Sequence, residues 1–163
     1  MKTEQNHAIR NAAAWLESIA AMVAALTCDY ARLDELRDLE EGKHLDGPEL
    51  DELNELTKQA NECDNEDTAR ERLQESPLSV QVRGGWYSPG STPSSARAEP
   101  EEFEILLSTG GPALRIIGEL DEHGQPTDCL MQWQDWGTPW TNYLNDSDEN
   151  SLLKFCQQFY FGE

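Results

Sequence analysis

The side chains that most often carry catalysis are present in this chain but scattered along it. His7, His44 and His123 lie far apart, and no local G-x-S-x-G signature accompanies them. The pairs Gly84-Gly85 and Gly110-Gly111 lack the Gly-Lys-Ser/Thr ending of a phosphate-binding loop. We therefore expect no enzyme, no catalytic residue and no cofactor, and a hydrolase ranks last among the alternatives.

Metal chemistry is not predicted either. An EF-hand loop read from Asp64 has Ala69 where the sharp turn needs glycine. The four cysteines lack the C-x-x-C spacing of zinc and redox sites, which predicts reduced thiols. They are Cys28, Cys63, Cys129 and Cys156.

The chain has a large excess of carboxylate side chains. Thirty-two acidic residues against twelve basic ones give a net charge of -20 in 163 residues. The segment 29–67 holds fifteen acidic and four basic residues, so more than half of the excess lies there. Because DNA carries one charge per roughly 1.7 Å of axis, twenty net charges equal the phosphates of about ten base pairs. The charge is typical either of a DNA mimic or of a solvated acidic surface.

A second candidate surface is aromatic. Trp133, Trp136 and Trp140 fall within eight consecutive residues. One interpretation is that the segment closes the edge of the core, with its indole N–H groups bonded to carbonyls. The other is a protein-binding hot spot at Trp136 and Trp140. Stacking on nucleic-acid bases is disfavoured, because the surrounding negative potential repels phosphates.

The elements that position the carboxylates are predicted to be two helices. Apolar residues at alternating steps of three and four predict one helix over about residues 5–41, roughly 50 Å long. Its stripe runs through Ile9, Ala12, Leu16, Ile19, Val23, Leu26, Tyr30 and Leu33. A second helix is predicted after Gly42 and reaches Cys63. It begins with a capping box of Asp46 and Glu49 and has Pro48 in its first turn. The two helices predict an antiparallel hairpin.

The outward positions of this hairpin form rows of carboxylates, since residues three or four apart on a helix are neighbours. They are Asp34, Asp38 and Glu41 on the first helix and Asp51, Glu52, Glu55 and Glu62 on the second. These seven acids, together with Trp136 and Trp140, are the predicted partner-binding residues.

A short helix over 65–75 is predicted next, and beyond Pro77 the apolar period changes to two. The alternation predicts strands near 78–83, 102–107, 114–120 and 128–134, with Leu78, Val80 and Val82 on a buried face. Gly110-Gly111-Pro112 and Glu122-His123-Gly124 supply turns. Residues 87–100, rich in Ser, Pro, Gly and Ala, predict a long loop.

A final helix is predicted from Asp146 through Phe159. The expected fold class is α+β, with an N-terminal acidic helical hairpin followed by a four-stranded antiparallel sheet and a C-terminal helix. The hairpin and short helix fill residues 1–76 and the sheet unit fills 77–163, and we expect the two to form one compact unit.

Four segments resemble those of small acidic proteins of unknown function encoded by phages and mobile plasmids. They are Gln134-Asp135-Trp136-Gly137-Thr138-Pro139-Trp140-Thr141, Phe159-Tyr160-Phe161-Gly162-Glu163, Pro77-Leu78-Ser79-Val80 and Glu119-Leu120-Asp121-Glu122-His123-Gly124. The resemblance assigns no catalytic residue. It implies a mobile-element setting, in which small acidic proteins often inhibit host defence as antirestriction or anti-CRISPR proteins, several of them by imitating DNA.

The leading hypothesis is therefore a phage-type inhibitor that blocks the nucleic-acid channel of a basic host complex, with a CRISPR effector preferred over a restriction enzyme. The alternative is an adaptor or immunity protein that binds through the Trp-rich segment. We expect no direct nucleic-acid binding, and a homodimer stays open.

We expect the protein to act in the cytoplasm of the bacterial host. The apolar run Ala12–Leu26 before Cys28 has features of an export signal, but Glu17 interrupts it and Thr27 replaces the small residue that a lipoprotein signal requires. No uninterrupted run of eighteen apolar residues occurs. No membrane span is therefore expected.

Overall fold

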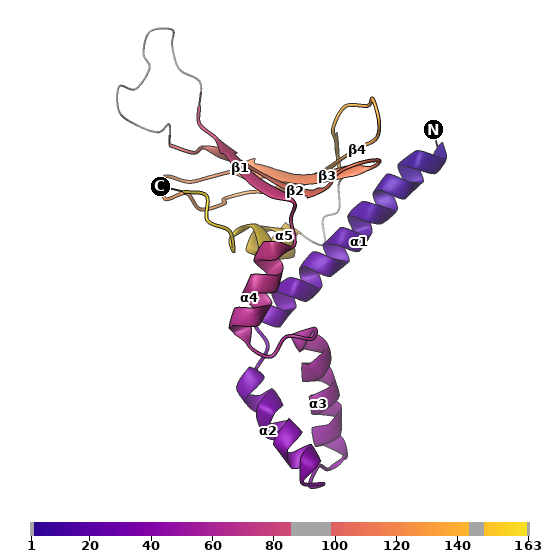
Figure 1. The fold of residues 1–163 in the computed structure, drawn as a ribbon, viewed down its shortest axis with the longest axis vertical. Helices are drawn as coiled ribbons and strands as arrows, with labels where there is room; N and C mark the ends of the chain where they lie inside the picture. The colour runs from indigo at the N-terminus through magenta and orange to yellow at the C-terminus, as the bar shows by residue number, and fades with distance from the viewer. Residues whose placement is uncertain (1, 86–98, 144–148, 163) are drawn as a thin grey trace.

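A computed structural model describes residues 2–85, 99–143 and 149–162 of the chain. Among the described residues, four helices come first, five strands follow them, and one further helix comes last (Figure 1). The elements are α1 Lys2–Leu26, α2 Tyr30–Glu41, α3 Gly47–Ala60, α4 Glu66–Glu75, β1 Ser79–Arg83, β2 Glu102–Ser108, β3 Ala113–Glu119, β4 Leu130–Gln134, β5 Thr141–Asn142 and α5 Glu149–Cys156. The architecture is α+β with an antiparallel sheet, as predicted.

The main core lies between one face of the sheet and the helices α1, α4 and α5 (Figure 1). Strand β2 shows how the sequence builds this face, because its buried and half-buried residues alternate along the strand. Phe103, Ile105 and Leu107 point into the core, and Ile19 of α1 and Phe155 of α5 are fully buried with them. We call this the inner face of the sheet, and the opposite face carries no helix among the described residues.

The sheet is a meander of five strands in the order β1-β2-β3-β4-β5, each antiparallel to its neighbours. The four predicted strands are present, and the fifth, β5, was not predicted. It contains only the exposed residues Thr141 and Asn142, too few to produce an alternation in the sequence. The predicted turns are confirmed, with Gly110 at φ 105° and Gly124 at φ 72°, a region that glycine enters without strain.

The prediction that β1 buries one face was wrong. Val80 is 37% exposed and Val82 45%, and Leu78 just before the strand is 60% exposed. The alternation is real, since Val80 pairs with the buried Ile105 and Val82 with the buried Phe103. However, β1 is the edge strand, and the described helices leave these side chains partly exposed.

The prediction of one helix over 5–41 was also wrong, because the chain breaks between Leu26 and Tyr30. Asp29 becomes the N-cap of α2, and its side chain accepts a hydrogen bond from the Arg32 backbone N–H at 3.0 Å. The Tyr30 hydroxyl donates to the Ala25 carbonyl oxygen at 2.8 Å and ties the two helices together across the break. The hairpin therefore consists of α2 and α3, whereas α1 is the central helix of the main core.

The predicted starts of the next two helices are confirmed, the first of them together with its predicted capping box. Asp46 and Glu49 form a reciprocal capping box at the start of α3, with a proline in the first turn. Asn65 and Thr68 form the same arrangement at the start of α4. The helix α3 ends at Ala60, before the predicted Cys63, because Asn61 takes a left-handed conformation with φ 50°.

Two further predictions concern the end of the chain and the long loop. The last helix stops at Cys156 rather than at Phe159, and its predicted start at Asp146 lies outside the described residues. The predicted loop over 87–100 lies outside them as well, except for its last two residues.

The helix α1 passes a length and hydropathy criterion for crossing a membrane over His7–Leu26, with a mean hydropathy of 1.2. The core helix of a soluble protein meets the same criterion. In the structure, Ala8, Ala12, Leu16 and Ile19 of this helix are buried against the sheet and the other helices.

Candidate functional site: two carboxylate rows on a protruding hairpin

The hairpin of α2 and α3, which we call the acidic hairpin, projects from the sheet and its covering helices (Figure 1). It has a small core of its own, in which Leu33 and Leu36 of α2 pack with Leu53 and Ala60 of α3. The base of the hairpin is tied to α1, where the Gln59 side chain donates to the Ala24 carbonyl oxygen at 3.1 Å. The tip of the hairpin is thus held in place by its own packing.

The structure places five of the seven predicted acids in two rows on opposite sides of the acidic hairpin. All seven side chains are exposed. At 3.6 residues per turn, Asp34, Asp38 and Glu41 lie about 130°, 170° and 110° around α2 from the midpoint of Leu33 and Leu36. Asp51 and Glu55 each lie about 160° around α3 from Leu53. The row on α2 contains Asp34, Asp38 and Glu41, and the row on α3 contains Asp51 and Glu55.

Opposite rows give the acidic hairpin the width of a duplex. Two packed helices lie about 8–10 Å apart, and each is about 10–12 Å wide with its side chains, so the pair is about 20 Å across. Within a row, acids four residues apart are separated by about 6 Å along the axis. The acidic hairpin therefore presents carboxylates on both of its sides, about 20 Å apart.

Arginines neutralise some of the predicted acids. The Arg32 guanidinium crosses from α2 to α3 and donates to both oxygens of Glu52, at 3.1 and 2.8 Å. This bond lowers the pKa of the Glu52 carboxyl below its usual value. On α2, the Arg37 guanidinium nitrogen Nη1 lies 3.6 Å from the carboxylate oxygen Oδ1 of Asp34. These pairs orient Glu52 and Asp34 and reduce the charge that they offer to a partner.

Glu62 lies apart from the two rows. It follows the end of α3, with φ 65°, and its carboxylate lies 3.7 Å from the Arg72 guanidinium of α4. The structure does not bring it into the α3 row.

Four predicted acids have no ion pair with another described residue: Asp38, Glu41, Asp51 and Glu55. Two lie in each row. A basic partner can reach these four predicted acids without first breaking an ion pair.

The structure separates the three tryptophans that the sequence places together. Trp133 is 8% exposed and belongs to the main core. The Arg115 guanidinium lies over the Trp140 ring on the outer face of the sheet, with Cζ of Arg115 4.1 Å from the centre of the ring. Trp136 is 81% exposed at the turn between β4 and β5.

The turn that carries Trp136 is fixed by hydrogen bonds. The Asp135 side chain accepts from the Trp136 backbone N–H at 2.8 Å, and the Thr138 backbone N–H donates to the Asp135 carbonyl oxygen at 3.0 Å. The Gln134 side chain donates to the Thr138 carbonyl oxygen at 2.7 Å, and Gly137 supplies the positive φ of 73° that the turn needs. The exposed indole is thus held on an ordered backbone.

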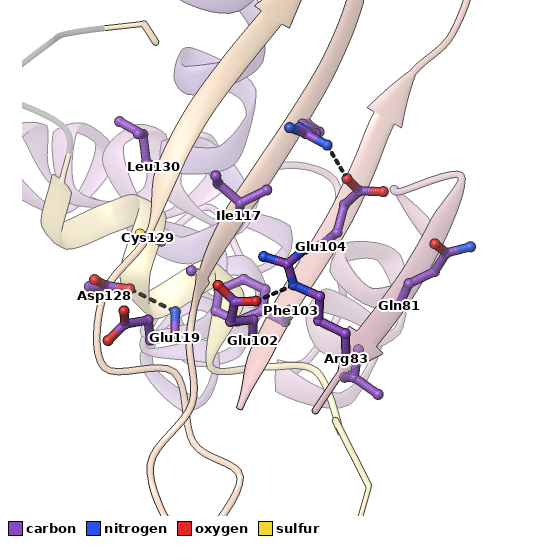
Figure 2. A pocket seen from close by; sticks show the side chains of 13 residues that line it. Gln81, Arg83, Glu102, Phe103, Glu104, Ile117, Glu119, Asp128, Cys129 and Leu130 are labelled. Carbon is purple, nitrogen blue, oxygen red and sulfur yellow. Dashed lines mark hydrogen bonds and ion pairs between the residues drawn. The ribbon is translucent and has the colours of Figure 1, made fainter. Parts of the chain in front are cut away.

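The outer face of the sheet holds a hollow of about 430 Å³ that the sequence reasoning did not find (Figure 2). Arg83 reaches across to Glu102 from the neighbouring strand, and this bond lowers the pKa of the Glu102 carboxyl. Arg115 donates to Glu104 at 2.6 Å in the same way. Because carboxylates already hold both guanidiniums, the hollow offers no unpaired cation to an anionic ligand. The sequence feature that could have predicted this hollow is the set of polar residues that alternate with apolar ones in β1, β2 and β3.

The structure also shows where the side chains that can bind metals or act as nucleophiles lie. No cluster of three or more His, Cys, Asp or Glu side chains with metal-binding geometry occurs in the described part of the chain. The four cysteines form no disulfide, and burial raises the pKa of Cys28 and of Cys156, which disfavours the reactive thiolate. His123 is exposed in its turn, where its ring lies 3.6 Å from Glu122.

Searches of protein-family models, of curated proteins and of solved structures found no match to this chain.

Proposed function

We propose that the protein inhibits a bacterial defence complex by occupying its nucleic-acid channel as an acidic mimic of DNA. The observation that carries the proposal is the pair of carboxylate rows on opposite sides of a hairpin that stands clear of the rest of the fold. The preferred target is a CRISPR effector and the next is a restriction enzyme, in the host cytoplasm.

The mechanism is competition by charge and shape. Lysines and arginines that normally hold phosphates would instead contact Asp38 and Glu41 on one side and Asp51 and Glu55 on the other. Such contacts speed association and weaken as salt screens them. The ordered core of the acidic hairpin limits the conformational entropy that binding must overcome.

Charge reversal of each row tests the proposal. The variants are Asp38→Lys with Glu41→Lys and, separately, Asp51→Lys with Glu55→Lys. A matched control is Glu71→Lys with Glu75→Lys, which makes the same charge change at exposed positions of α4. The assay measures displacement of a fluorescent DNA duplex from purified CRISPR effectors and restriction enzymes by fluorescence anisotropy.

The wild-type protein is expected to displace DNA from a target complex, and each row variant to associate about tenfold more slowly at low salt. The control variant is expected to behave as wild type. Equal weakening by all three variants would show that bulk charge acts rather than the two rows. No displacement from any complex in the panel would contradict the inhibitor proposal.

A second candidate function rests on Trp136. An indole that is 81% exposed on an ordered turn is typical of an anchor for a partner protein, and here the protein would be an adaptor or immunity protein. Trp136→Ser would then abolish partner binding, whereas both row reversals would leave it intact. The DNA-mimic proposal expects the opposite pattern.

A further inference from the structure

The strand β1 leaves one edge of the sheet open. It is five residues long, and its outer edge has no strand partner in the described part of the chain. The other edge, β5, has only two residues and offers a much shorter template. Open edges pair readily with further strands, and folded proteins usually block them with charges, prolines or bulges.

Apolar side chains are concentrated at the same edge. Leu78, Val80 and Val82 are 60%, 37% and 45% exposed. They lie on the inner face, beside the buried Ile105 and Phe103 of β2. The apolar layer of the main core therefore extends beyond the helices that pack on it, and its outermost side chains are exposed to solvent.

The stretch of sequence that contains β1 is the least acidic in the chain. Residues 76–98 contain no acidic residue and two arginines, Arg83 and Arg97, in a chain with a net charge of -20. No other stretch without an acidic residue is as long. Two copies of this protein repel each other through their net charge, and β1 itself adds no negative charge to a contact between them.

The strand is complementary to itself. When two copies of β1 run antiparallel about a two-fold axis at Val80, Val80 faces its equivalent and Leu78 faces Val82 of the second copy. All six apolar side chains then lie on one face, and Ser79 faces Gln81 on the other. This register brings no acidic side chain of the strand into the pairing.

We propose that β1 is a dimer interface, at which it pairs antiparallel with β1 of a second copy and joins two five-stranded sheets into one sheet of ten strands. The occupant is a second copy because apolar complementarity and the absence of acids both favour self-pairing. The acidic hairpin takes no part in the contact.

Sedimentation velocity over a concentration series tests the interface. The wild-type protein is expected to shift with concentration from 18.4 kDa to twice that mass. The dimer is expected to tighten as NaCl rises, because salt screens the repulsion between the copies. Binding of the acidic hairpin to a basic partner weakens over the same range, so the two proposals fail independently. A wild-type protein that stays at 18.4 kDa at every concentration would overturn the dimer.

The variant Val80→Lys places two like charges opposite each other at the two-fold axis and is expected to weaken dimerisation at least about tenfold. The control is Ile9→Lys on α1, which makes the same kind of change at a side chain that is 44% exposed and distant from the edge. It should leave the dimer unchanged. A dimer that persists in folded Val80→Lys would place the interface elsewhere and contradict the proposal.

Hydrogen exchange of the wild-type protein gives a test that needs no variant. The β1 amides are expected to gain protection as the protein concentration rises, whereas the amides of β3 should not change. Protection of β1 that is strong and independent of concentration would mean that another segment of the same chain already covers the edge. That outcome would overturn the dimer as well.

Discussion

Truncation of one leucine should open the acidic hairpin and leave the rest of the fold in place. Leu36 is fully buried in the small core between α2 and α3, which is separate from the core under the sheet. A third, small cluster of buried residues, Ala25, Cys63 and Ala69, lies between the two cores at the base of the hairpin. The change Leu36→Ala therefore acts on the acidic hairpin.

The magnitude follows from the burial of this side chain. Buried Leu→Ala changes cost about 2.7–5.0 kcal/mol, and each 1.4 kcal/mol is a factor of ten. The open population of the acidic hairpin should therefore rise about a hundredfold to several thousandfold. Because few other buried residues hold the two helices together, local opening is expected to become easier than global unfolding.

Native-state hydrogen exchange resolved by mass spectrometry measures this difference. The amides of α2 and α3 should exchange faster in Leu36→Ala, while those of β2 and β3 keep their wild-type rates. The comparison variant Leu114→Ala removes a fully buried side chain from the main core and should lower protection throughout the sheet. Equal acceleration of the acidic hairpin and the sheet in Leu36→Ala would refute the separation of the two cores.

Two further predictions concern pH and packing. Burial raises the pKa of Tyr30 to about 12, so the folded phenol keeps its proton where the unfolded phenol, near about 10, has lost it. Because the unfolded chain then binds fewer protons, the free energy of unfolding should fall as pH rises from about 10 to about 12. Chemical denaturation over this pH range should show that the free energy of unfolding falls less in Tyr30→Phe than in the wild-type protein. An equal fall in the two proteins would contradict the raised pKa of Tyr30. The change Gly118→Ala places a β-carbon against the Asp128 carbonyl oxygen and 2.6 Å from Cε1 of Phe103, so it should destabilise the protein by about 1–3 kcal/mol in urea denaturation. Gly47→Ala, with no atom within 4 Å of the added carbon, is the control, and an equal loss of stability there would contradict the packing argument.

Where the determinants are local, the sequence predicted the structure well. The start of α3 depends on two side chains three residues apart, Asp46 and Glu49, and both make the predicted hydrogen bonds. The alternation of β2 and the glycine turns were likewise evident, because each is set by the backbone conformation of a few adjacent residues. The excess of acids in 29–67 required only counting.

The errors arose where distant parts of the chain compete. The apolar stripe of α1 continues in phase across the break at Asp29, so its period alone gave no sign that the helix ends. Val80 has the pattern of a buried residue, yet its burial depends on how far the helices extend across the sheet. The two pairing arginines of the acidic hairpin, Arg32 and Arg37, were visible, but which acids they neutralise depends on packing.

The sequence by itself determined the net charge, its concentration in one segment and the classes of element that carry it, because these follow from composition and local periodicity. Only the tertiary structure decided that the carboxylates face opposite sides of a projecting hairpin and that Trp136, but not Trp133, meets solvent. It also decided that β1 ends the sheet at an open edge. The physical reason is that exposure is a property of what packs against a residue, and those partners lie far away in the chain.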